Sequence, residues 1–116
     1  MTHKAYQNTQ AVTEDPRATE YRIFGKVTGA LIDAEKAGKS GGPLAEAVDW
    51  NRKLWRTLAS DCLDDRNQLP RDVRAQIVSL SLWVSKYSKQ VTRNGAPMQP
   101  LIEVNRNIMQ GLQGAA

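Results

Sequence analysis

The segment from Asn67 to Val91 predicts a helix that is apolar on two opposite sides. At about 100° between successive residues, one arc of roughly 80° contains six core-forming side chains: Val73, Ile77, Leu80, Val84, Tyr87 and Val91. Val78 and Leu82 lie on the opposite side. A helix of a small protein carries a second apolar side when neighbouring helices enclose it or when a partner covers it. We therefore expect this helix at the centre of a bundle or at an interface.

The chain has 116 residues, enough for one domain that buries roughly two thirds of the surface exposed by its unfolded chain. The single cysteine, Cys62, excludes an internal disulfide and lies on an apolar stripe, so we expect a buried thiol, with a reactive thiol as the alternative. No signal peptide is apparent, and the longest uncharged run, Ala75 to Ser85, is shorter than the roughly 20 residues that span a bilayer. We expect one cytoplasmic domain over residues 1–116, outside the membrane, with loose ends at about 1–3 and 113–116.

The net charge of +4 is concentrated in the C-terminal half of the chain. Residues 1–65 contain nine Lys/Arg and ten Asp/Glu, whereas residues 66–116 contain seven Lys/Arg and two Asp/Glu. A basic half would suit an acidic partner or RNA. However, the basic residues are scattered, and the sequence has no polybasic run, no RNP-like aromatic signature and no zinc-ligand spacing. Specific nucleic-acid binding is therefore not the function we expect.

Prolines and glycines mark the expected ends of the helices. Asp15 and Pro16 are typical of an N-cap and a first helical residue, and a helix of about 22 residues would end near Lys36 and Gly38. Further helices are expected from Pro43 to Cys62, from Pro70 to about Arg93 and from Pro100 to about Leu112, with a short one from Lys4 to Val12. No segment alternates with period two. The sequence predicts an all-α single-domain antiparallel helical bundle of four main helices plus a short N-terminal helix.

Four small or polar residues are expected at helix contacts. Asn51 and Asn105 project into the apolar stripes of their helices, and a buried amide without hydrogen-bond partners costs a few kcal/mol. We expect them to form a polar pair that fixes helix register, with a ligand site as the alternative. Gly25 and Gly29 each cost about 1 kcal/mol relative to alanine in a helix. They indicate close approach by another helix of this chain, or a groove that admits a partner's helix.

The candidate partner-binding residues lie at the margins of the expected core. Trp50 and Leu54 widen the apolar arc of their helix, as Trp83 does in the next one, and marginal aromatic residues suit interface anchoring. The second apolar side of the helix over 70–93 continues into basic residues, a pattern that can dock an amphipathic helix with acidic residues at one end. The helix dipole also favours such cations. The candidate partner-binding surface comprises Trp50, Leu54, Val78, Leu82, Trp83, Lys86, Lys89 and Arg93.

No catalytic residue, metal ligand or cofactor site is expected. The only histidine, His3, lies near the start of the chain, which excludes the triads and multi-histidine sites that need this side chain within the fold. Asp64 and Asp65 are adjacent, but they lie in an expected turn, where we interpret them as polar residues that end a helix and not as an acid–base pair. The GlyLysSerGlyGly tract at 38–42 lacks the spacing of a phosphate-binding loop and follows a helix instead of a strand. The sequence therefore predicts a protein that is not an enzyme.

Several separated blocks of the sequence resemble one family. They are AlaTyrGlnAsnThrGln near the start, ThrGluTyrArgIlePhe at 19–24, AspTrpAsnArgLysLeuTrp at 49–55, AsnGlnLeuPro at 67–70, ArgAlaGlnIleValSerLeuSerLeuTrpVal at 74–84 and IleGluValAsnArgAsnIleMetGlnGlyLeu at 102–112. In this order the blocks resemble the FlaF flagellar biosynthesis regulators of alphaproteobacteria. The likeness covers nearly the whole chain except the linker from 36 to 42, and none of the blocks is a catalytic motif.

The resemblance implies a small cytoplasmic factor for flagellin production and export, acting alongside the translation regulator FlbT. FlaF-like proteins are pictured as secretion chaperones that bind flagellin and so affect its synthesis. Flagellin is thus the expected partner, with FlbT and the flagellar export gate as further ones. Two alternatives remain: a regulator that acts on flagellin mRNA directly or through FlbT, and a structural interaction protein that self-associates through Val78 and Leu82. The resemblance assigns no binding residue, so the candidate surface depends on the helical-face argument alone.

Overall fold

The computed structural model describes residues 16–38 and 41–115. Four helices account for most of this part of the chain: α2 (Pro16–Lys36), α3 (Gly42–Cys62), α4 (Arg71–Asn94) and α5 (Gln99–Ala115). They confirm the all-α fold with four main helices, and the described ranges contain no strand. The expected short helix from Lys4 to Val12, the N-cap Asp15 and His3 lie outside the described residues.

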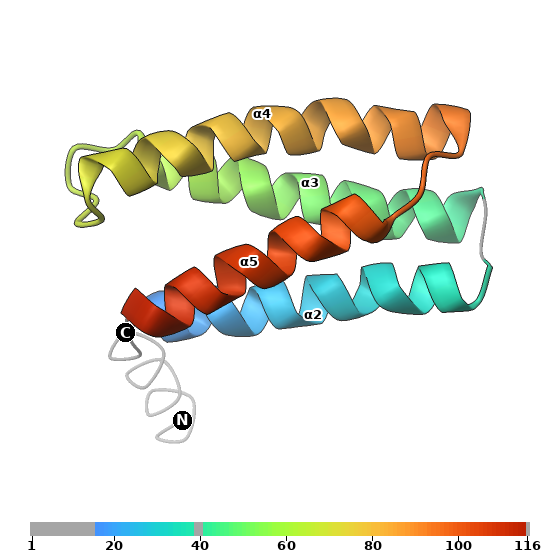
Figure 1. Cartoon of the computed structure of the whole chain (residues 1–116), viewed down its shortest axis with the longest axis horizontal. Helices are drawn as coiled ribbons and strands as arrows, with labels where there is room; N and C mark the ends of the chain where they lie inside the picture. Colours follow the sequence, from blue (N-terminus) through green and yellow to red (C-terminus); the bar gives the residue numbers. More distant parts are fainter. Residues whose placement is uncertain (1–15, 39–40, 116) are drawn as a thin grey trace, which may run out of the picture.

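Helices that follow one another in the chain are antiparallel, but α5 diverges from α4. In Figure 1, α2, α3 and α4 run back and forth, and α5 crosses obliquely from the end of α4 to lie along α2. Helix α3 therefore contacts both α2 and α4, whereas α5 packs mainly on α2 and makes few contacts with α4. The molecule is 21 Å thick, about two helix diameters. Among the four described helices, none packs on one side of α4 and one side of α5.

The observed helix ends lie within a residue or two of the expected ends, except at the C-terminus. Gly41, with φ of 65°, precedes α3, and Pro43 occupies its first turn, where its missing N–H group leaves no hydrogen bond unmade. Gly95 ends α4 in the left-handed conformation, with φ of 69°. Helix α5 continues to Ala115, three residues beyond the expected end at Leu112.

The connection between α3 and α4 is held by hydrogen bonds of its own side chains. The Arg66 guanidinium donates to both carboxylate oxygens of Asp64, at 3.1 and 2.8 Å, and the Arg66 backbone N–H donates to Oδ1 at 2.9 Å. These side-chain and backbone hydrogen bonds lower the pKa of the Asp64 carboxyl below its ordinary value. Asn67 links the turn to α3 by donating to the Asp61 carbonyl. The start of α4 is thereby fixed relative to α3.

All four helices contribute to one apolar core. Trp55 of α3 is fully buried, and its indole meets the ring of Phe24 from α2 edge to face, with centroids 5.5 Å apart. Cys62 is buried, as expected from its position on an apolar stripe. Further buried side chains come from every helix: Val27, Leu31, Val48, Leu58, Ile77, Val84, Val91, Leu101, Ile102 and Leu112. The faces that periodicity predicts to be apolar are therefore the faces that form this core.

Candidate functional site

An apolar groove lies between α4 and α5, where the two helices diverge. Its volume is about 450 Å³. The lining comes from the end of the α3–α4 connection, the first three turns of α4 and the last two-thirds of α5: Leu69, Pro70, Val73, Gln76, Ile77, Leu80, Val104, Asn107, Ile108, Gly111 and Leu112. We refer to these residues as the α4–α5 groove.

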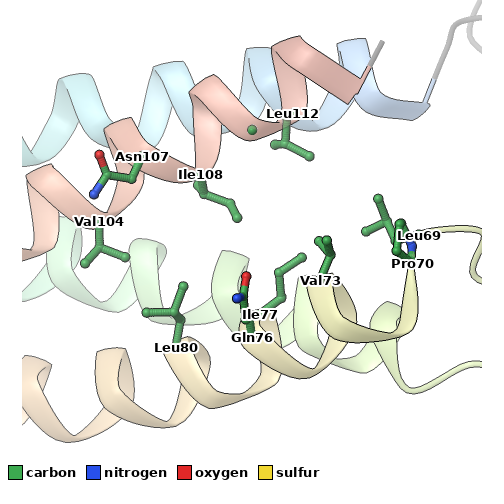
Figure 2. Close-up of a pocket in the computed structure, with 11 residues that line it drawn as sticks. Leu69, Pro70, Val73, Gln76, Ile77, Leu80, Val104, Asn107, Ile108 and Leu112 are labelled. Atoms are coloured by element: carbon green, nitrogen blue, oxygen red, sulfur yellow. The ribbon is translucent and has the colours of Figure 1, made fainter.

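The two walls of the groove present apolar side chains at helical spacing. Figure 2 shows Val73 and Ile77 of α4 on one wall, opposite Ile108 and Leu112 of α5 on the other. Ile77 and Leu112 are nearly fully buried, whereas Val73 and Ile108 are only partly buried against the core. Large apolar side chains left partly open on two facing helices are the usual lining of a groove that receives a third helix.

A hydrogen bond fixes the connection between α4 and α5, at the end of the groove where the two helices are joined. The Tyr87 hydroxyl of α4 donates to the Pro97 carbonyl, at 2.7 Å, in the segment between α4 and α5. The ring of Tyr87 stacks on Trp83, with centroids 5.0 Å apart and the planes at 12°. These contacts fix the point from which α5 leaves α4, and so they determine where the groove begins to widen.

The far wall of the groove is held by a buried polar network. Asn105 of α5 accepts a hydrogen bond from the Trp55 indole N–H at 2.8 Å and donates to Asn51 Oδ1 at 2.8 Å and to Thr28 Oγ1 at 3.1 Å. Both asparagines are completely buried. The network joins α2, α3 and α5 and does not include α4. It orients α5 towards α2 and thus away from α4.

The two glycines of α2 have different surroundings. A β-carbon at Gly25 would lie 3.7 Å from the Met109 methyl of α5, which is an ordinary van der Waals contact, so alanine would fit there. A β-carbon at Gly29 would meet no atom of a neighbouring element within 4 Å. The expected close approach by a helix of the same chain therefore explains neither glycine.

None of the partner-binding residues chosen from the sequence lines the groove. Val78 is partly buried against the core and lies beside Cys62 at the α3–α4 contact, so α3 covers that part of the second apolar side of α4. Leu82 is 63% exposed and continues along α4 into exposed Lys86, Lys89 and Arg93. On α3, Trp50 is 45% exposed and Leu54 is partly buried. Apart from Val78, the candidates therefore form two groups: Leu82, Trp83 and the basic row on α4, and Trp50 with Leu54 on α3. Their binding role stays a prediction.

Replacing Leu82 by lysine tests the exposed row on α4. Because Leu82 is mostly exposed, we expect Leu82→Lys to change the free energy of unfolding by no more than about 0.5 kcal/mol. The sequence-based hypothesis also predicts weaker partner binding. Urea unfolding followed by circular dichroism measures the first effect, and calorimetric titration measures the second. A large loss of stability would show that Leu82 supports the fold, and unchanged binding would remove this row from the interface.

Neither a metal site nor a membrane-spanning helix is found in the part of the chain that the structure describes. There, no three His, Cys, Asp or Glu residues are grouped so that they could hold a metal ion. None of the described helices combines the length and apolarity needed to cross a membrane.

Comparison with known proteins gives one match. The model of a family described as "Flagellar protein FlaF" matches residues 2–112, nearly the whole chain. No curated protein and no solved structure matches. The match includes every residue that lines the α4–α5 groove.

Proposed function

Because the chain belongs to the FlaF family of flagellar proteins, we propose that it is a secretion chaperone that binds flagellin in the cytoplasm before export. By holding unexported flagellin, it would also affect how much flagellin the cell makes. FlbT and the export gate would act with this complex.

The observation that supports this proposal most strongly is the open apolar groove between α4 and α5. The terminal regions of flagellin form amphipathic helices, and these must be kept from polymerising before export. An amphipathic helix binds by placing its apolar face in a groove of this kind. The groove is already present in the free protein, so little conformational entropy is lost in forming it.

The size of the groove suits reversible binding. Burying three large apolar side chains of a partner helix yields a gross gain of roughly 5–9 kcal/mol. The loss of translational and rotational freedom reduces this gain, and a dissociation constant of 1 μM corresponds to about −8 kcal/mol. The groove alone therefore supports micromolar or weaker binding. A chaperone that must release its cargo at the export gate requires such reversibility.

Light scattering of purified protein with and without monomeric flagellin tests the proposal. We expect the free protein to be a monomer and the mixture to contain a one-to-one complex. Calorimetric titration should then give a micromolar dissociation constant. A stable homodimer that does not bind flagellin would contradict the proposal. Binding to flagellin mRNA with an affinity that falls steeply with salt, without binding to flagellin, would support the regulatory alternative instead.

A further inference from the structure

We infer that the α4–α5 groove recognises an amphipathic helix with lysine or arginine residues along its flanks, and that this helix comes closest to α5 at Gly111. The inference rests on the proposed function, which identifies flagellin as the protein that contains this helix. It adds the chemistry of the bound segment and the point of closest contact.

The described part of the fold gives no reason for a glycine at position 111. It lies within α5, where glycine is among the least favourable residues, and its backbone is helical. A β-carbon there would meet no atom of a neighbouring element within 4 Å. Yet Gly111 lines the groove beside Ile108 and Leu112. A glycine at such a position lets a second helix approach the backbone of α5 closely.

The charge around the groove indicates the chemistry of the occupant. Residues 66–116 contain seven basic side chains and only two carboxylates, Asp72 and Glu103. Both are exposed, and each precedes by one helical turn an amide that lines the groove: Gln76 on α4 and Asn107 on α5. The only two acidic residues of a basic half therefore flank the same groove. They favour an occupant with cations on its flanks.

The positions of the two carboxylates also set a spacing. The two walls run in opposite directions: Figure 2 shows Pro70 at one end of the groove and Val104 towards the other. In the sequence, Asp72 follows Pro70 by two residues and Glu103 directly precedes Val104, so the two carboxylates belong to opposite ends of the groove. The α4 wall from Val73 to Leu80 spans about 10 Å at 1.5 Å per residue. The matching segment is therefore a helix of two to three turns with its cations near opposite ends and on opposite flanks.

A size series at Gly111 tests the point of closest contact. We expect Gly111→Ala to raise the thermal stability of the free protein and to weaken flagellin binding slightly. Gly111→Leu should weaken binding by roughly tenfold or more, the effect of losing one anchoring contact. Thr57→Leu on α3 is the matched control, because it adds the same side chain at an exposed position outside the groove, and it should bind like the wild type.

Charge reversal tests the chemistry of the occupant. Asp72→Lys with Glu103→Lys should weaken flagellin binding by roughly tenfold at low salt, and the difference should shrink as the salt concentration rises. Asp33→Lys with Glu35→Lys changes the net charge equally at exposed positions on α2 and should retain binding. Equal losses in the two double variants would overturn the assignment of these carboxylates.

Failure of the inference can be told from failure of the proposed function. If the wild-type protein does not bind flagellin, the proposed function fails. If it does bind and Gly111→Leu binds equally well, the groove is not the docking site and the inference is wrong. Reduced stability of free Gly111→Leu with unchanged binding would show that the chain itself fills the groove. If the wild type is a dimer and Gly111→Leu is a monomer, a second copy of this chain is the occupant. Either of these last two results overturns the inference.

Discussion

Replacing Asn105 by alanine is expected to lower the free energy of unfolding by about 3–4 kcal/mol. The change removes the acceptor of the Trp55 indole N–H and the donor to Asn51 and Thr28. A buried polar group left without a partner costs about 1–3 kcal/mol. For a domain of this size the melting temperature should fall by about 12–16 °C. Urea denaturation and thermal melts followed by circular dichroism measure both quantities.

Asn107→Ala is the matched control for this prediction. Asn107 lies on the same helix two residues later, but its side chain is exposed on the rim of the groove. Its replacement should change the free energy of unfolding by no more than about 0.5 kcal/mol. Similar effects of the two substitutions would mean that the network around Asn105 is not what holds α5 against α2 and α3.

Replacing Ile108 by aspartate is expected to weaken flagellin binding by about a hundredfold or more. Ile108 lies on the α5 wall and is partly buried in the free protein. A bound helix would cover it completely. The variant would lose an apolar anchor and would place an unpaired carboxylate against an apolar face, which adds a desolvation cost. Calorimetric titration of flagellin measures the loss, and circular dichroism at the assay temperature confirms that the variant is folded.

Ile23→Asp provides the control for Ile108→Asp. Ile23 is 36% exposed on α2 and does not line the groove, so the same substitution adds the same charge elsewhere on the surface. We expect this variant to bind flagellin like the wild type. If both aspartate variants lose binding to the same extent, then net charge or general stability governs the effect, and the groove has no special role.

The helices and most of the core could be predicted from the sequence because both depend on local patterns. Proline at helix starts and glycine at ends mark the boundaries, and residues such as Phe24, Leu31 and Ile77 recur at the spacing that buries one face. The end of α5 was predicted three residues too early, at Leu112, because the last residues of a chain were expected to be loose, whereas the helix continues to Ala115.

The groove could not be predicted because it depends on which helices are neighbours. The sequence identifies Val73, Ile77 and Leu80 as one apolar stripe of α4, and a stripe alone does not reveal that α5 turns towards α2 and leaves part of it uncovered. The prediction therefore assigned spare apolar surface to Val78 and Leu82, on the opposite side. In the structure, α3 covers Val78.

Two details of the sequence could have drawn attention to the groove. Asn105 meets Asn51 and Thr28 across helix contacts, and an inward asparagine in the last helix indicates that this helix packs on another polar position. Gly111 lies within a segment of helical pattern, and no turn is expected there that would explain a glycine. Neither signal identifies the opposite wall of the groove, because that requires the tertiary arrangement.

The most direct test of flagellin capture in the α4–α5 groove is a methyl NMR titration with flagellin. The chain contains five isoleucines: Ile23, Ile32, Ile77, Ile102 and Ile108. Ile77 and Ile108 lie on opposite walls of the groove, whereas Ile23 is exposed on α2. We predict that flagellin shifts the δ1-methyl signals of Ile77 and Ile108 and leaves that of Ile23 in place. Binding that shifts Ile23 but neither Ile77 nor Ile108 would contradict capture in the groove.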